Sequence, residues 1–194
     1  MDPVHTVRAF VALFIVMDLP GNIPIFLSLT KGMTLLEQKR AFNRAVVSAV
    51  IILLTFALFG EAILELFNIS IGSFMIAGGA LLLVISVDLL LGTSLVQKAE
   101  REDVAVVPMG TPLLAGPGAI TMAIMFIRTY GRVETLCAIA LCFLVSRVVL
   151  RYAAEIGRVL GKAGSNILSR LLALLVAAIA VQFIINGVTE VFGL

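Results

Sequence analysis

A polar stretch with a proline interrupts the first apolar run of the chain, residues 6–29. Its sequence, "DLPGN", contains Asp18, Pro20, Gly21 and Asn22. A proline inside a helix removes a backbone donor and displaces the carbonyl four residues earlier, and a neighbouring glycine resists unwinding least. The half-helix after such a break begins with unpaired N–H groups, which favour an anion such as a carboxylate. Asp18 and the freed carbonyls before it suit an ammonium group, a cation or a proton.

A similar stretch occurs in the second half of the chain. There "GPGAI" contains Gly116, Pro117 and Gly118, and short polar side chains flank it at Thr111 and Thr121. Two breaks at matching positions of two halves indicate one shared site near the middle of a membrane. The small residues at both breaks predict a small ligand, and one small zwitterion would satisfy both ends.

The composition requires a membrane as the surroundings of these breaks. Of 194 residues, 61% are apolar and 13% are charged, against about 45–50% and about 25% in soluble domains. A spanning helix needs about 20 mainly apolar residues, and six runs qualify: 6–29, 41–66, 71–94, 109–129, 133–152 and 168–192. They predict an all-α integral membrane protein with six transmembrane helices in one domain, residues 1–194, with the helices of the first and fourth runs broken at Pro-Gly.

The two Pro-Gly stretches belong to a longer internal repeat. Val-Asp at the end of the third run, which includes Asp88, matches Val-Gln in the sixth run, which includes Gln182. Residues 1–94 and 109–194 therefore read as two copies of a three-helix unit, joined by a charged connection at 95–108. Because three is odd, the second copy enters the membrane from the opposite side, so we expect inverted repeats.

Lysine and arginine predict the orientation. If the six runs alternate, the connections 30–44, 95–108 and 147–170 share one side, and all basic residues except Arg8, Arg128 and Arg132 lie there. The positive-inside rule places these connections in the cytoplasm and both termini outside, in a multi-pass protein of the plasma (inner) membrane. The net charge of +2 is then mainly a topology signal. We expect the lipid bilayer as a partner and no nucleic acid, while a homo-oligomer stays open.

Four blocks of the sequence resemble the MarC family, also called the neutral amino-acid transporter family. The blocks are "DLPGNIPIFLSLT" (18–30), "IAGGALLLVISVD" (76–88), "TPLLAGPGAIT" (111–121) and "AIAVQFIINGV" (178–188). The resemblance implies a six-helix protein of the amino-acid exporter superfamily, some of whose members move glycine or alanine. One departure concerns the first break, where Leu19 separates Asp18 from Pro20 although the family has the proline directly after the acid. The shift rotates the kink by about 100°.

Other readings of the polar residues stay open. Asp18 either belongs to the site or caps a broken helix. Asp88 either takes part in ion coupling or reaches the interface, and Gln182 either contacts the ligand or bonds a neighbouring helix.

The sequence contains none of the common catalytic motifs. It contains no Ser/His pair, no HExxH, no CxxC and no glycine-rich phosphate loop after a strand. Cys137 and Cys142 are five positions apart in an apolar run, where apolar packing is their ordinary role. We therefore expect no enzyme, no catalytic residue, no bound metal and no cofactor, with H⁺ or Na⁺ as the coupling ion.

Two function classes remain. The first is a secondary transporter of small neutral amino acids that works by alternating access. Its substrate-binding residues would be Asp18, Pro20, Gly21, Asn22, Thr111, Gly116, Pro117, Gly118, Thr121 and Gln182, with Asp18 and Asp88 for proton or ion coupling. The alternative is a passive small-solute channel, or a membrane interaction subunit without transport of its own.

Overall fold

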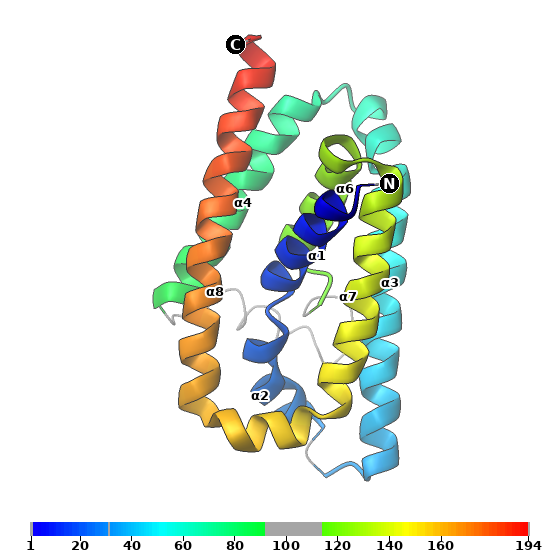
Figure 1. The fold of residues 1–194 in the computed structure, drawn as a ribbon, viewed down its shortest axis with the longest axis vertical. Coiled ribbons are helices and arrows are strands. Elements are labelled where there is room, and N and C mark those ends of the chain that lie inside the picture. Colours follow the sequence, from blue (N-terminus) through cyan, green and yellow to red (C-terminus); the bar gives the residue numbers. More distant parts are fainter. Residues whose placement is uncertain (1, 31, 92–113, 194) are drawn as a thin grey trace.

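The protein is all-helical in the part of the chain that the structure describes. This computed structural model describes residues 2–30, 32–91 and 114–193. The helices in those ranges are α1 (Pro3–Met17), α2 (Leu19–Leu29), α3 (Leu35–Leu66), α4 (Ile71–Leu91), α6 (Pro117–Tyr130), α7 (Arg132–Arg151) and α8 (Ala153–Phe192) (Figure 1). Five segments there are long and apolar enough to cross a membrane: Pro3–Ile23, Leu35–Leu66, Ile71–Leu91, Arg132–Arg151 and Ala163–Phe192. These segments confirm the multi-span, all-α prediction.

The fourth predicted run, 109–129, corresponds to α6. This helix begins only at Pro117 and has 14 residues. At about 1.5 Å per residue it is about 21 Å long, which is less than the roughly 30 Å thickness of the hydrocarbon core. Thr111 and the predicted connection 95–108 lie outside the described residues. Within the described ranges α6 is therefore a half-span, and the sixth full span stays a prediction.

A capping box extends α3 beyond its apolar run. The predicted run begins at residue 41, but α3 begins at Leu35. The Glu37 N–H donates to Thr34 Oγ1 (3.3 Å), and the Thr34 N–H donates to Glu37 Oε2 (2.8 Å). These reciprocal bonds satisfy two donors at the helix start. The sequence "TLLE" carries this pattern, so the correct start was readable from it.

A glycine bends α8 near one end of the molecule. The helix begins at Ala153, well before the predicted run 168–192, and Gly161 inside it has φ 61° and ψ −178°. Glycine is the residue that adopts this region of backbone space without strain. The segment before Gly161 runs across the lower end of the molecule in Figure 1, and the segment after it runs along the long axis.

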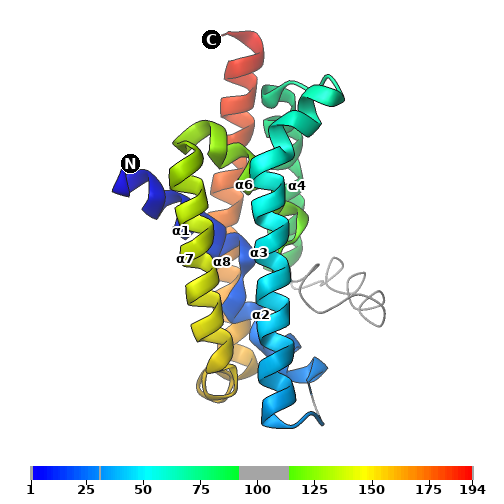
Figure 2. The same ribbon diagram turned by 90° about the vertical axis from the view of Figure 1, so that its right-hand side faces the viewer.

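The helices of the two predicted repeats run in opposite directions. In Figure 1, α1, α4 and α7 descend the long axis, whereas α3, α6 and the long part of α8 ascend it. Each predicted repeat pair packs together: α1 with α6, α3 with α7, and α4 with α8. Both termini lie toward one end, opposite the α2–α3 and α7–α8 connections (Figures 1 and 2). Which end faces the cytoplasm, and where the repeats begin and end, stay predictions.

Glycines allow α4 and α8 to approach closely. A Cβ at Gly79 would lie 2.7 Å from the Ala180 carbonyl oxygen, and one at Gly187 would lie 2.7 Å from the Gly72 carbonyl oxygen. Backbone atoms cannot move aside as side chains do, so these glycines are required for the contact. Small residues at helix interfaces are typical of membrane bundles, which bring backbones together by packing alone.

Candidate functional site

Asp18 forms the interruption between α1 and α2. Its backbone is left-handed, with φ 39° and ψ 49°, a region that aspartate tolerates better than most residues. The Asp18 N–H donates to the Ile15 carbonyl oxygen (3.1 Å), which ends α1. Its carboxylate Oδ1 accepts from the Gly21 N–H (3.2 Å), which begins α2. One residue therefore caps two helices.

Asn22 closes the interruption from the other side. Its amide Nδ2 donates to the Met17 carbonyl oxygen (3.1 Å), and its N–H donates to the Asp18 carbonyl oxygen (3.0 Å). Both side chains are buried, with 5% of Asp18 and 9% of Asn22 exposed. Unpaired backbone groups are costly inside a bilayer, and these bonds satisfy three of the groups that the interruption frees.

The helical backbone stops before the proline and not at it. Pro20 is the second residue of α2, in the first turn, where backbone N–H groups have no partner within the helix. Its missing donor therefore costs no helix bond. The first run is interrupted at Asp18, two residues before Pro20, so a break at Pro20-Gly21 itself is not confirmed.

Ser169 of α8 completes the group around Asp18. Its hydroxyl is hydrogen-bonded to the Asp18 carboxyl group. A Cβ added at Gly21 would overlap both Ser169 Oγ and the Asp18 carboxylate, so glycine is required there. Ser169 was not predicted from the sequence. No short-range pattern links it to Asp18, and only the bend at Gly161 and the packing of α8 on α2 bring the two together.

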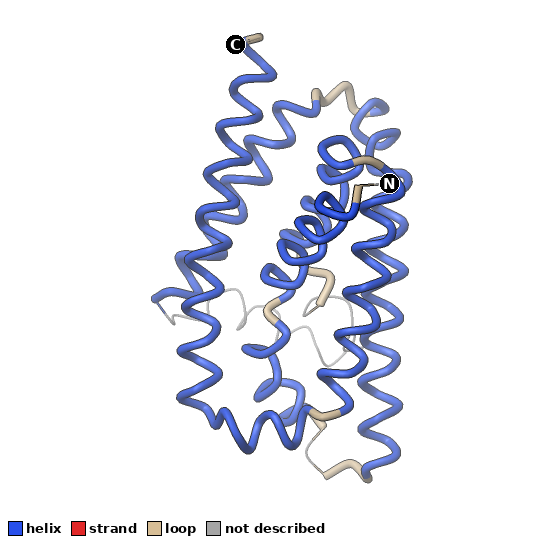
Figure 3. Tube along the Cα trace, in the orientation of Figure 1, coloured by secondary structure: helices blue, strands red, loops and turns tan. Residues whose placement is uncertain are grey.

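The start of α6 lies beside the α1–α2 interruption. Gly116 is the N-cap of α6 and Pro117 its first residue, and no side chain caps this end. A Cβ at Gly118 would lie 2.7 Å from Leu82 Cδ2 and 3.2 Å from Val16 Cγ1. The end of α1 and the start of α6 are therefore in contact, and both non-helical stretches lie near the middle of the molecule (Figure 3).

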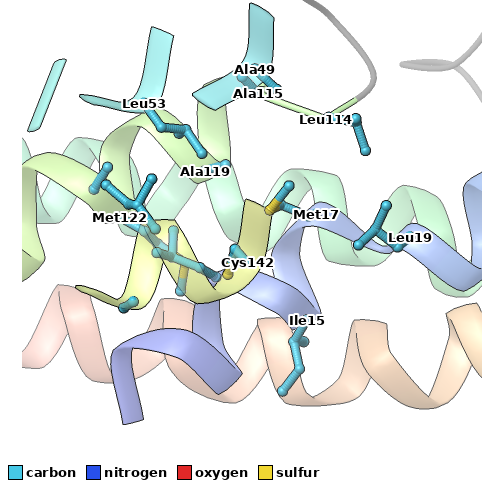
Figure 4. Close-up of a cluster of buried hydrophobic side chains, with 14 of the residues drawn as sticks. Ile15, Met17, Leu19, Ala49, Leu53, Leu114, Ala115, Ala119, Met122 and Cys142 are labelled. Carbon is cyan, nitrogen blue, oxygen red and sulfur yellow. The ribbon is translucent and has the colours of Figure 1, made fainter. Parts of the chain in front are cut away.

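An apolar cluster surrounds the two helix ends. Met17 and Leu19, on either side of Asp18, share it with Leu114, Ala115 and Ala119 from the region where α6 begins (Figure 4). All five are buried, with at most 3% exposed. Polar groups at the interruption are thus enclosed by apolar side chains, which strengthens their electrostatic interactions.

The remaining predicted residues lie in different places. Thr121 is buried on α6, and its side chain occupies the space that a Cβ of Gly78 would need. Asp88 is buried on α4, with 8% exposed, and does not extend to an exposed surface. Gln182 is exposed, and its amide donates to Asn186 Oδ1 (2.7 Å).

Gln182 is also distant from the Asp18 group. It lies thirteen residues after Ser169 on α8, which corresponds to about 20 Å along a helix. The structure therefore brings together Asp18, Gly21, Asn22 and Gly118, but not Gln182. Among the described residues, no group of three His, Cys, Asp or Glu side chains could hold a metal ion.

Comparison with known proteins identifies the family. The profile of the MarC family integral membrane proteins matches residues 4–192. The chain belongs to the MarC family. It is 38% identical to a UPF0056 membrane protein of Archaeoglobus fulgidus, over 94% of this chain and 91% of the relative. This MarC chain is also 36% identical to the UPF0056 membrane protein YhcE of Escherichia coli, over 95% of this chain and 92% of the relative.

A further relative supports the same assignment. The MarC chain is 36% identical to a UPF0056 membrane protein of Methanocaldococcus jannaschii, over 97% of this chain and 98% of the relative. No solved structure matches it. The family resemblance inferred from the four sequence blocks is thus confirmed, and the chain is a multi-pass integral membrane protein.

Proposed function

We propose that this MarC chain is a secondary transporter of small neutral amino acids such as glycine and alanine. The observation that carries the proposal is the contact between Val16, at the end of α1, and Gly118, at the start of α6, beside the buried acid Asp18. Discontinuous helices that meet around a polar group are typical of transporter binding sites. A kink with only a structural role would not require a second helix end beside it.

The two helix ends offer opposite charges to a zwitterion. The N-terminal end of α6 carries a partial positive charge, and Gly116 gives it no side-chain cap, so it suits a carboxylate. Asp18 suits the ammonium group of the same molecule, or a coupling H⁺ or Na⁺. Asp88, buried on α4, is a second candidate for coupling.

Glycines on both sides of the contact favour a small substrate. Neither Gly21 nor Gly118 has room for a methyl group without a shift of its neighbours. These glycines let the protein's own side chains pack closely around the two helix ends, and a small amino acid would displace them least.

The arrangement of the helices supports inverted repeats and alternating access. α7 packs on α1 as α3 packs on α6, and α8 packs on α1 as α4 packs on α6. This correspondence between the packing of the two halves is expected if a pseudo-two-fold axis relates them. In such a protein, rocking of one half against the other exposes a fixed site to each side of the membrane in turn. Residues 92–113 stay outside this comparison.

The basic end of the bundle supports an orientation in the plasma membrane. Lys39 and Arg44 at the beginning of α3, and Arg147 and Arg151 at the end of α7, lie toward the end opposite the termini. The positive-inside rule assigns this end to the cytoplasm and the termini to the outside. The proposed transport mechanism requires only a single copy of the chain.

Transport assays test the proposal. The full chain is reconstituted in liposomes, and uptake of labelled glycine and alanine is followed with and without an imposed pH or sodium gradient. We expect saturable uptake that one gradient stimulates and that unlabelled alanine inhibits. Uptake that rises linearly with concentration would favour the passive channel instead. Absence of flux in either direction for any small neutral amino acid would contradict transport and favour the interaction subunit.

A further inference from the structure

A pocket lies between α3 and α7, away from the helix interruptions. Its volume is about 330 Å³, and Lys39, Asn43, Arg147 and Arg151 supply its polar lining. It lies toward the end of the bundle that holds the α2–α3 connection, because α3 begins and α7 ends there (Figure 2). The pocket joins three cationic side chains from two helices around one cavity.

The three cations have no acidic partner among the described residues. The ion pairs in those ranges join Asp2 with His5 and Glu61 with Arg128. The acid of the first turn of α3, Glu37, accepts from the Thr34 N–H and hydroxyl group instead. Clustered positive charge without carboxylates attracts an anion, and lysine and arginine are the usual ligands of phosphate.

The pocket lies at the ends of two apolar helices, where basic side chains can reach the lipid headgroups. The 32 residues of α3 are about 48 Å long, whereas the hydrocarbon core needs only about 20 residues. The continuous apolar part of α3 begins after Arg44, so Lys39 lies more than one turn before it and Asn43 lies at its edge. Arg151 is the last residue of α7, and Arg147 lies about one turn before it.

Apolar side chains form the rest of the wall. Phe42 and Leu150 are buried at the pocket, and Val148 at its rim is 56% exposed. An acyl chain would continue past Val148 along the outer face of the bundle. A free inorganic anion would make no use of this apolar wall, which therefore favours a lipid over a soluble ligand.

We propose that the pocket between α3 and α7 binds the headgroup phosphate of an anionic phospholipid of the adjacent leaflet. Lys39, Arg147 and Arg151 contact the phosphate oxygens, and Asn43 bonds the remaining polar groups of the headgroup. This inference requires only that the chain spans a membrane and is independent of the transport proposal.

A pair of double variants separates a specific pocket from general surface charge. Lys39→Gln with Arg147→Gln removes two charges of the pocket. Arg40→Gln with Arg44→Gln removes two exposed charges of α3 that do not line it. Binding of phosphatidylglycerol to each purified full chain is measured by native mass spectrometry, with phosphatidylcholine as the neutral comparison. Thermal unfolding in detergent checks that every variant is folded.

We expect the wild-type chain to retain phosphatidylglycerol in preference to phosphatidylcholine. The pocket variant should bind phosphatidylglycerol about tenfold or more weakly, and the control variant within about twofold of the wild type. Equal losses in both variants would overturn the proposal in favour of diffuse surface charge. Equal binding of the two lipids would overturn it as well. Stabilisation by inorganic phosphate alone, to the same extent as by lipid, would assign the pocket to a soluble anion.

Discussion

Val16 contacts Gly118 across the centre of the bundle, so that the end of α1 meets the start of α6. A Cβ placed on Gly118 would lie 3.2 Å from Val16 Cγ1. The two residues are distant in the sequence, and each lies next to a place where the helical backbone stops. Asp18 is two residues beyond Val16. It is the only acid of the first transmembrane segment, Pro3–Ile23, so the contact lies beside that acid.

Substitution of Asp18 tests its capping role. Alanine at position 18 removes the acceptor for the Gly21 N–H, which costs about 1 kcal/mol. Alanine also adopts the left-handed backbone of this position less readily than aspartate, which costs about 1–2 kcal/mol more. We expect Asp18→Ala to lower the free energy of unfolding by about 2–3 kcal/mol in total. Asp18→Asn keeps both properties and should stay within about 1 kcal/mol of the wild type. Asp18→Gly should be intermediate in stability, because glycine adopts the left-handed backbone readily but, like alanine, has no acceptor for the Gly21 N–H.

Unfolding in a mild detergent, followed by circular dichroism, measures this order. The capping account requires asparagine to be the most stable of the three variants and alanine the least. It fails if Asp18→Ala unfolds at the same denaturant concentration as Asp18→Asn.

Gly21 tests the contact between α2 and α8. Its Cβ would overlap Ser169 Oγ and the Asp18 carboxylate, so Gly21→Ala should destabilise the protein by about 1–3 kcal/mol. The double variant Gly21→Ala with Ser169→Ala should recover part of this loss, since it removes one overlapping atom. Gly164→Ala is the matched control on α8, because its Cβ would meet Leu160 Cβ at an ordinary 3.4 Å. A Gly21→Ala protein as stable as Gly164→Ala would contradict the packing described here.

How much of this site was readable from the sequence differs from residue to residue. The run around Asp18 showed that a helix is interrupted there, because an acid, a proline and a glycine rarely share an apolar span. The exact residue was not readable, since Asp18 adopts the left-handed backbone and leaves Pro20 in a first turn. Ser169 was not readable at all, because its approach depends on the bend at Gly161 and on packing between distant segments.

Gly187 tests the close packing of α4 and α8. An added Cβ would lie 2.7 Å from the Gly72 carbonyl oxygen, a backbone atom that cannot rotate away. We expect Gly187→Ala to cost about 1–3 kcal/mol of stability. Gly157→Ala is the comparison, because the nearest atom to its Cβ is Leu27 Cδ1, at the end of a flexible side chain. Thermal unfolding should rank Gly187→Ala well below Gly157→Ala, and the reverse order would refute the backbone contact.

The ion pair between Glu61 and Arg128 provides a prediction of no effect. Its N···O distance is 3.1 Å, but 62% of the Arg128 side chain and 36% of the Glu61 side chain are exposed. Exposed pairs contribute about 0–1 kcal/mol, less at high salt. Glu61→Gln should therefore change the unfolding free energy by less than about 1 kcal/mol. A larger loss that persists at high salt would indicate that this pair is shielded from water.

Substrate transport by variants of the two helix ends tests the central claim most directly. Uptake of labelled alanine into liposomes is compared for the wild type, Asp18→Asn, Gly118→Leu and the control Gly164→Ala, after thermal unfolding has shown that each is folded. The account predicts that Gly164→Ala transports like the wild type, that Asp18→Asn loses stimulation by the gradient, and that Gly118→Leu loses uptake. Undiminished, gradient-stimulated uptake by both Asp18→Asn and Gly118→Leu would contradict a substrate site where α1 meets α6.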